Sequence, residues 1–350
     1  ILSEACRNVA SGTTKAVSLI LICAVGVGLP LLADLLAIGQ ISRQADIFEE
    51  SWANVQRVEA QRQIDGNNCD GLVDGSSLSH AGGLREGPVI EIDQAPGVAM
   101  TSYEVTPGFI EMLTENAGNA IGVWIESSLA ETLVVKPGVV LSIAGQEVPV
   151  AGVFDWPADG RDARLRVAML IPVMANGQFD ECWARSWPMV SSIGQLLWST
   201  VSMGASGIPM LPKQINASLG STFDEQYRLQ QRVTRAVYWV VPLVMAGVGC
   251  LTVWRRRLEY ATHLHLGQSK PDLLSGVALE TGLWALLGSA LGVNLAMVLA
   301  LSLEAVPAEG VKPLVVRMIA WPSTAAVLAA TILASTLKAR RYPLYAKTVS

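Results

Sequence analysis

Four long apolar segments constrain the fold of this 350-residue chain more than any other feature. They cover residues 16–39, 236–254, 277–303 and 314–337. Crossing the roughly 30 Å hydrocarbon core of a bilayer takes about 20 helical residues at 1.5 Å each, and every segment is close to that length or longer. The sequence therefore predicts an α-helical membrane protein with four transmembrane helices.

The composition agrees with a membrane location. Charged residues make up only 16% of the chain and the mean hydropathy is +0.39, whereas a soluble domain carries about 25% charged residues. Apolar residues gather towards the two ends, and the middle resembles an ordinary soluble protein. The net charge of −5 and the lack of a basic stripe argue against nucleic-acid binding.

The first apolar segment raises the alternative of a cleaved signal peptide. The apolar region of a signal peptide spans about 7–15 residues and ends at a small-residue cleavage site. Segment 16–39 is longer, and no Ala-x-Ala follows it. We therefore expect a retained helix. Asp34 in its second half either lines a polar path or occupies a capped position near the interface, and the second is the commoner case.

Basic residues in the short loops predict the orientation, because cytoplasmic loops carry an excess of Lys and Arg. They are Arg7 and Lys15 before the first segment, Arg255, Arg256, Arg257 and Lys270 between the second and third, and Lys338, Arg340, Arg341 and Lys347 after the fourth. Loop 304–313 has only Lys312 against two glutamates. Segments 1–15, 255–276 and 338–350 are thus expected in the cytoplasm. Loop 304–313 and segment 40–235 are expected outside.

Segment 40–235 is long enough to hold a core of its own. Near-helical spacing of apolar residues predicts a helical stalk at 46–62. A polar helix pattern with acidic residues in its first turn predicts a returning stalk at 221–235. Between the stalks we expect an α+β domain, inserted between transmembrane helices 1 and 2. Its predicted elements are strands at 89–93, 99–105, 139–143, 147–154 and 166–172 and a helix at 124–133.

The cysteines divide by location. Cys6, Cys23 and Cys250 lie in or beside the apolar segments, where a thiol is usually a small apolar residue. Cys69 and Cys182 are the cysteines of the outer segment, and an oxidising outer face permits a disulfide between them. The chain-entropy model values such a cross-link at about 4–5 kcal/mol at most. Two free thiols are the alternative.

Segment 255–276 is the most informative stretch. A basic cluster leads into an amphipathic helix that Gly267 ends, and Pro271 begins the next helix. A general interpretation is a re-entry turn held by positive-inside charges. The segment also resembles the FtsX-like permease family. The matching residues are Arg256, Arg257, Glu259, Leu266, Gly267, Gln268, Ser269 and Glu280, followed by a run of small residues at 287–292.

In that family this helix, called the coupling helix, presses on a nucleotide-binding subunit. The resemblance therefore implies that an ATPase is coupled through Arg256, Arg257, Glu259, Leu264, Leu266, Gly267 and Glu280. His263 and His265 depart from the family pattern. Residues 105–109, Val-Thr-Pro-Gly-Phe, resemble an element of MacB-type outer domains, as do the stretches 123–133, 136–138 and 148–154. Glu4, Ala5, Arg7 and Asn8 are similar to a family pattern before the first span.

The chain as a whole thus resembles the permease subunit of a MacB/FtsX-type ABC transporter. It lacks G-x-x-x-x-G-K-[ST], and the nearest piece, residues 12–15, leads directly into a membrane segment. The resemblance implies a bacterial cell-membrane protein without enzyme activity or cofactor of its own. ATP and magnesium would bind to a separate ABC ATPase, and a second permease subunit, identical or different, would complete the dimer among membrane lipids.

Other motifs carry less chemistry. Gly288 and Gly292 form a G-x-x-x-G pattern that permits close helix packing, within the chain or between chains. His263 and His265 lie on different helical faces without an evident third ligand, so no metal site is expected. No catalytic residues are expected either. The favoured function is export of amphipathic molecules such as antimicrobial peptides or lipid-like compounds. The alternatives are mechanotransmission to a cell-wall hydrolase and extraction of lipoproteins.

Overall fold

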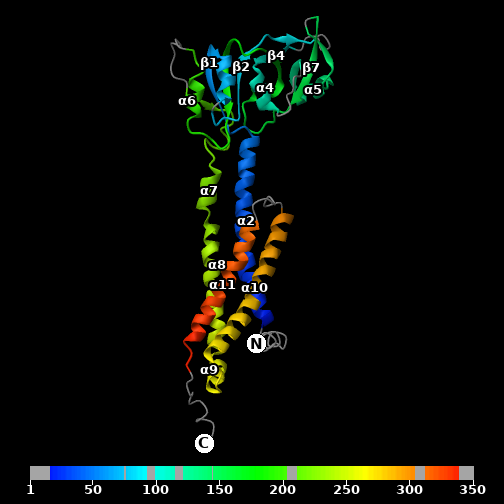
Figure 1. Ribbon diagram of the computed structural model, residues 1–350. Coiled ribbons are helices and arrows are strands. Elements are labelled where there is room, and N and C mark those ends of the chain that lie inside the picture. The colour runs from blue at the N-terminus through cyan, green and yellow to red at the C-terminus, as the bar shows by residue number, and fades with distance from the viewer. Residues whose placement is uncertain are drawn as a thin grey trace. The chain divides into compact units, whose positions relative to one another are not determined.

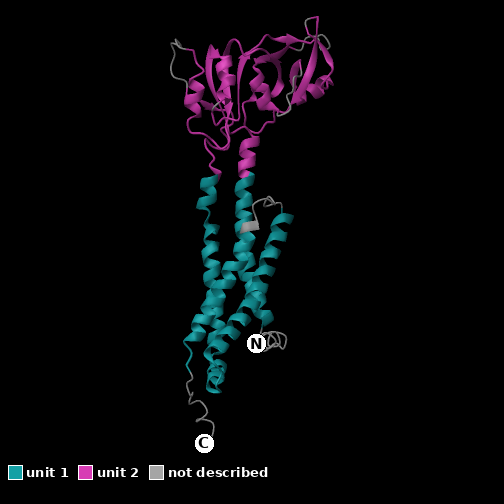
Figure 2. Ribbon diagram, in the orientation of Figure 1, with its two compact units in different colours: residues 1–43, 226–350 teal, residues 44–225 magenta. Residues whose placement is uncertain are grey.

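The computed structural model describes residues 16–74, 76–92, 99–114, 121–143, 145–202, 211–303 and 312–338. The chain divides into two compact units, Ile1–Arg43 with Gln226–Ser350 (unit 1) and Gln44–Glu225 (unit 2) (Figure 2). Several segments used in the predictions lie outside the described residues. They are some of the basic residues that predict the orientation, the pattern at residues 4–8 with Cys6, and loop 304–311.

Unit 1 is helical (Figure 1). Its elements are α2 (Ala16–Glu50, which continues into unit 2), α7 (Glu225–Gln231), the 3₁₀ turn η3 (Val233–Ala236), α8 (Val237–Arg255), α9 (Arg257–His265), α10 (Lys270–Ser302) and α11 (Lys312–Ser335). Within the described residues, four stretches are long and apolar enough to cross a membrane: Ala16–Glu50, Val233–Arg255, Lys270–Ser302 and Leu314–Ser335. The prediction of four apolar helices is confirmed.

The four long helices share one apolar core. Cys23, Val27, Leu31 and Leu35 recur every fourth residue on α2 and are fully or almost fully buried, since residues at this spacing lie on one helix face. They pack in one cluster with side chains of α8, α10 and α11, including Trp284. The other sides of the helices expose large apolar residues, which suits contact with lipid.

Glycines let the helices approach one another closely. A Cβ at Gly288 would collide with the Cβ of Cys23, and a Cβ at Gly292 would collide with the carbonyl oxygen of Ala24. Both glycines therefore face α2 of the same chain. Gly249 of α8 makes a similar approach to the backbone of α11, which the sequence did not predict. Such small-residue contacts replace the hydrophobic driving force that is absent in lipid.

Unit 2 is built on one mixed sheet with the order β10-β1-β9-β2-β4-β8-β5-β7-β6, in which β3 also pairs with β4. The strands are β1 (Val55–Asp65), β2 (His80–Glu86), β3 (Ile90–Glu91), β4 (Ala99–Val105), β5 (Val123–Glu126), β6 (Val140–Ile143), β7 (Gln146–Phe154), β8 (Ala168–Pro172), β9 (Gln178–Arg185) and β10 (Lys213–Gln214). The pairs β4–β8 and β5–β7 are parallel, and the other pairs are antiparallel.

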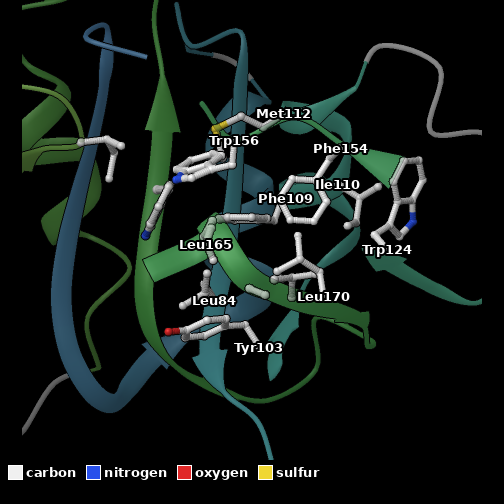
Figure 3. Close-up of a cluster of buried hydrophobic side chains, with 14 of the residues drawn as sticks. Leu84, Tyr103, Phe109, Ile110, Met112, Trp124, Phe154, Trp156, Leu165 and Leu170 are labelled. Atoms are coloured by element: carbon white, nitrogen blue, oxygen red, sulfur yellow. The ribbon is translucent and has the colours of Figure 1, made fainter. Parts of the chain in front are cut away.

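Short helices complete unit 2, namely α3 (Gly66–Asp70), α4 (Pro107–Leu113), α5 (Ser127–Leu133) and α6 (Ile193–Trp198), with 3₁₀ turns η1 (Gly71–Val73) and η2 (Ala163–Val167). A cluster of buried apolar side chains, rich in aromatic rings, includes Phe109 of α4 and Trp156 (Figure 3). Trp183 contacts the ring of Phe109 edge-on at 5.1 Å. The mixed α/β character expected for the outer segment is thus confirmed.

Two predicted helices in unit 2 were wrong in part. The stalk expected at 46–62 ends at Glu50, because Trp52 adopts a left-handed backbone with φ 62°, and Val55–Asp65 is a strand between β9 and β10. The helix expected at 124–133 begins only at Ser127. Residues Val123–Glu126 are all buried and form a strand between β7 and β8.

The remaining predictions for this segment fared better. Four of the five predicted strands correspond to β4, β6, β7 and β8, while the stretch at 89–93 contains only the two-residue β3, and Asp93 lies outside the described residues. The returning stalk at 221–235 is shorter than expected: α7 begins at Glu225 and ends at Gln231. The disulfide between Cys69 of α3 and Cys182 of β9 is present, which confirms that prediction.

Candidate functional site

The candidate site is the turn that joins α8 to α10 through the short helix α9. Arg256 stands between α8 and α9, and its backbone N–H donates to the carbonyl oxygen of Thr252 in the last turn of α8. A cation at this position is favoured, because the carbonyl end of a helix carries partial negative charge.

Arg256 ties three elements together through its guanidinium group. Nη1 donates to Oε1 of Glu280 at 2.5 Å, and Nε donates to Oε2 of Glu259 at 2.8 Å. The guanidinium carbon also lies 5.1 Å from the ring centroid of Tyr260. The side chain of Glu280 is only 15% exposed, whereas that of Glu259 is 60% exposed. The ion pair between Arg256 and Glu280 therefore contributes more to the stability of the turn than the pair with Glu259, because solvent screens the more exposed pair.

The electrostatics keep Arg256 charged. Burial alone would lower the pKa of the guanidinium group, but its hydrogen bonds to the carboxylates of Glu259 and Glu280 and the negative charge of Glu280 raise it. Burial raises the pKa of Tyr260 to about 12, so the phenol stays protonated beside the arginine. Arg256 therefore keeps its positive charge throughout the physiological pH range.

The pair lies beside a cavity of about 270 Å³. The cavity is lined by Ser18, Leu19 and Ile22 of α2, Thr252 and Arg255 of α8, Arg256, Tyr260 of α9, and Glu280, Thr281 and Trp284 of α10. The first turns of α2 and the turn at Arg256 therefore line a common space.

Helix α9 has one face turned inward. Ala261 is buried, and Leu264 packs against a cluster formed by Val253, Leu273, Val277, Ala330 and Ala334. The other face is open, since Leu258 is 47% exposed and Leu266 is 80% exposed. Of the two leucines expected to contact a partner, Leu264 is partly buried against this cluster and Leu266 is exposed.

The turn after α9 has a defined geometry. Gly267 adopts φ 95°, and the N–H of Gln268 donates to the carbonyl oxygen of His263 at 3.1 Å. Such a left-handed glycine commonly ends a helix. Ser269 then caps α10, accepting from the N–H of Asp272, and Pro271 occupies the first turn. The predicted stop and start of these helices correspond to this arrangement.

The structure brings together only part of the predicted set. Arg256, Glu259 and Glu280 form one cluster, while Arg257 lies outside it, with its guanidinium carbon 4.9 Å from the ring centroid of Trp254. The sequence analysis missed Tyr260. An aromatic residue four positions after an arginine on a helix is a signal that could have found it.

A second charged cluster surrounds Asp34, whose side chain is fully buried. Arg232 donates through Nε to Oδ1 at 2.8 Å, and the hydroxyl of Tyr238 donates to Oδ2 at 2.8 Å. Of the two interpretations considered for Asp34, this geometry favours a satisfied, capped position.

No protein-family model and no curated protein sequence matches this chain. Solved structures that resemble it include the periplasmic region of MacB from Actinobacillus actinomycetemcomitans, with 12% identity, a TM-score of 0.33, and coverage of 45% of this chain and 88% of that one. A domain of a protein described as a permease from Porphyromonas gingivalis has 16% identity and a TM-score of 0.35, covering 52% and 99%.

The extracellular domain of the noncanonic ABC-type transporter YknZ from Gram-positive bacteria has 14% identity and a TM-score of 0.29, covering 41% of this chain and 87% of that one. At such identities and scores these likenesses do not assign the chain to a family.

Proposed function

We propose that this chain is the permease subunit of an ABC transporter, driven by a separate ATPase and acting on amphipathic substrates. The observation that carries the proposal is the turn at Arg256. One guanidinium group holds α9 against α10, while α9 exposes Leu258 and Leu266. A helix anchored on one side, with two exposed leucines among polar and charged residues on the other, suits transmission of force from a docked protein.

Helix α2 supplies a route for that force. It is a continuous helix from Ala16 to Glu50, and its first turns line the cavity beside Arg256. A push on α9 would reach α2 through the side chains around this cavity. The permease and substrate assignments remain proposals that extend from this geometry and from the resemblance of segment 255–280 to FtsX-like permeases.

The far end of α2 is firmly held within unit 2. Arg161 donates to the carbonyl oxygen of Glu50 at 2.8 Å, Asn216 to that of Ser51 at 3.0 Å, and Gln214 to that of Ala53 at 2.5 Å. The Phe48 ring packs against Phe223 with 5.5 Å between centroids. The carbonyl oxygen of Glu50 at the end of α2, and those of Ser51 and Ala53 just after it, thus accept hydrogen bonds from side chains of unit 2.

Thiol labelling tests the position of α9. Leu266→Cys places a thiol at a site that is 80% exposed. In intact cells an impermeant maleimide should leave it unlabelled, and in inverted vesicles the same reagent should label it. Labelling in intact cells would overturn the proposal.

Co-purification tests the partner. The tagged chain should retain an ABC ATPase from its own host, and amphiphiles should change the rate of ATP hydrolysis by the complex. The control is the variant Leu266→Asp, which should purify as a folded chain without the ATPase. Retention of the ATPase by this variant would contradict docking on α9.

A further inference from the structure

Arginine side chains gather at the beginning of α8 and α11. Arg232, Arg235, Tyr238, Trp239, Leu314 and Arg317 line a cavity of about 380 Å³ within unit 1. It lies at the other end of α8 from the turn at Arg256, and the function proposed above does not use it.

The cavity has an excess of positive charge. Asp34 neutralises Arg232 through the 2.8 Å contact described above. Within the described residues no ion pair neutralises Arg235 or Arg317. The first turns of α8 and α11 add partial positive charge, because the amino end of a helix carries about half an elementary charge. An anion is therefore the ligand that this cavity favours.

Aromatic rings surround the same arginines. The guanidinium carbon of Arg317 lies 5.4 Å from the ring centroid of Tyr238 and 5.5 Å from that of Trp321. Trp239 and Trp321 meet edge-on with centroids 6.3 Å apart, and both are about half exposed or more. Tryptophan and tyrosine at the ends of membrane helices lie at the level of the lipid headgroups.

Apolar surface continues from the cavity along both helices. Val240, Leu243 and Val316 are between 53% and 75% exposed. A ligand with an anionic head and hydrocarbon tails would place its head among the arginines and its tails along these side chains. A free phosphate would contact only the arginines and would leave the apolar side chains uncovered.

We propose that this cavity binds the phosphate of an anionic phospholipid. Arg235 and Arg317 donate to the phosphate oxygens, since planar guanidinium groups match that geometry. Arg232 remains paired with Asp34 and forms part of the wall of the cavity. The proposal requires that α8 and α11 span a membrane, and it is independent of any ATPase. On the orientation predicted from the basic loops, the lipid belongs to the outer leaflet.

Native mass spectrometry of the purified, delipidated full-length chain tests the proposal. Phosphatidylglycerol and phosphatidylcholine with identical acyl chains are titrated separately. The wild-type chain should bind one phosphatidylglycerol more tightly than it binds phosphatidylcholine. Loss of each arginine charge should weaken phosphatidylglycerol binding about fivefold, and the double variant R235Q/R317Q about twentyfold.

The matched control is Lys270→Gln, an exposed basic residue of the same unit outside the cavity. It should leave binding unchanged, and R235K/R317K should keep most of it. Equal phosphatidylglycerol affinity in wild type and R235Q/R317Q would overturn the proposal, as would equal affinity for both lipids. If glycerol phosphate displaces the lipid at equal concentration, the ligand is a soluble phosphate and the lipid assignment fails.

If R235Q/R317Q does not purify as a folded chain, the single variants R235Q and R317Q carry the same test. Both side chains are exposed, so each variant should fold. Unchanged lipid affinity in both single variants would also overturn the proposal.

Discussion

Helix α8 has arginines at both of its ends, and they are used in opposite ways. At one end Arg256 forms hydrogen-bonded ion pairs with Glu280 and Glu259. These carboxylates neutralise its charge and fix the turn. At the other end Arg235, together with Arg317 of α11, faces a cavity without a carboxylate partner within the described residues. The comparison teaches that an arginine with a buried partner sets geometry, whereas an unpaired one is available to a ligand.

The largest effect on the free energy of unfolding is expected when the ion pair between Arg256 and Glu280 is removed. Glu280→Ala leaves Arg256 without its less exposed partner and should destabilise the chain by about 2–3 kcal/mol, less than for a fully buried pair. Unfolding of the purified chain in detergent measures this. The matched control Glu259→Ala removes the exposed partner and should cost about 0.5 kcal/mol or less. Equal losses in both variants would refute the distinction.

A smaller effect on stability is expected at Asp34, which pairs with Arg232 beside the unpaired Arg235 and Arg317. Asp34→Asn keeps an acceptor for Arg232 but removes the negative charge, so unfolding should become easier by about 1–2 kcal/mol. The same change adds an uncompensated charge to the cavity and should tighten phosphatidylglycerol binding about fivefold. Weaker binding of phosphatidylglycerol to Asp34→Asn would show that the negative charge of Asp34 does not repel the lipid phosphate. Tyr238→Phe is the control, because it removes one hydrogen bond without changing the charge.

The paired arginines of unit 2 extend the comparison to pH. Burial alone would raise the pKa of Asp162, but the hydrogen bonds and charges of Arg57 and Arg164 lower it below its ordinary value. A lowered pKa means that the carboxylate stabilises the fold fully above its ordinary pKa of about 3.9, and that this stabilisation is lost as the pH falls through the native pKa.

Acid unfolding of the full-length chain, followed by tryptophan fluorescence, should therefore show a loss of stability below about pH 4. The variant Asp162→Asn should be less stable at neutral pH and should lose less between pH 5 and 3. If both chains show the same pH dependence, Asp162 does not contribute to it.

The smallest effect on stability is expected on the open face of α9. Leu266 is 80% exposed, so Leu266→Asp should change the free energy of unfolding by less than about 0.5 kcal/mol. Leu264→Asp is the contrasting variant, because it would bury a charge in the cluster around Leu273. A large destabilisation by Leu266→Asp would show that this residue packs within the chain rather than facing a partner.

Sequence patterns predicted the helical part of the chain well, because a helix in lipid must be long and apolar whatever its neighbours. They also singled out Arg256 and Glu280. They did not distinguish Arg256 from Arg257, because that depends on where α8 ends and in which direction the chain turns. The cavity of Arg235 and Arg317 escaped notice, since its residues are 82 positions apart and meet only through the packing of α8 and α11.

The sheet of unit 2 shows the opposite balance. Strands β1, β2 and β9 were missed, and Val123–Glu126 was assigned to a helix, because short amphipathic or apolar stretches suit either structure until their neighbours are known. By itself the sequence determined four apolar helices and a mixed α/β unit, which follow from local composition, whereas it only permitted the disulfide that the tertiary structure forms. Only the tertiary structure decided which arginines are paired and which are open, because charge pairing depends on distances between residues far apart in the chain.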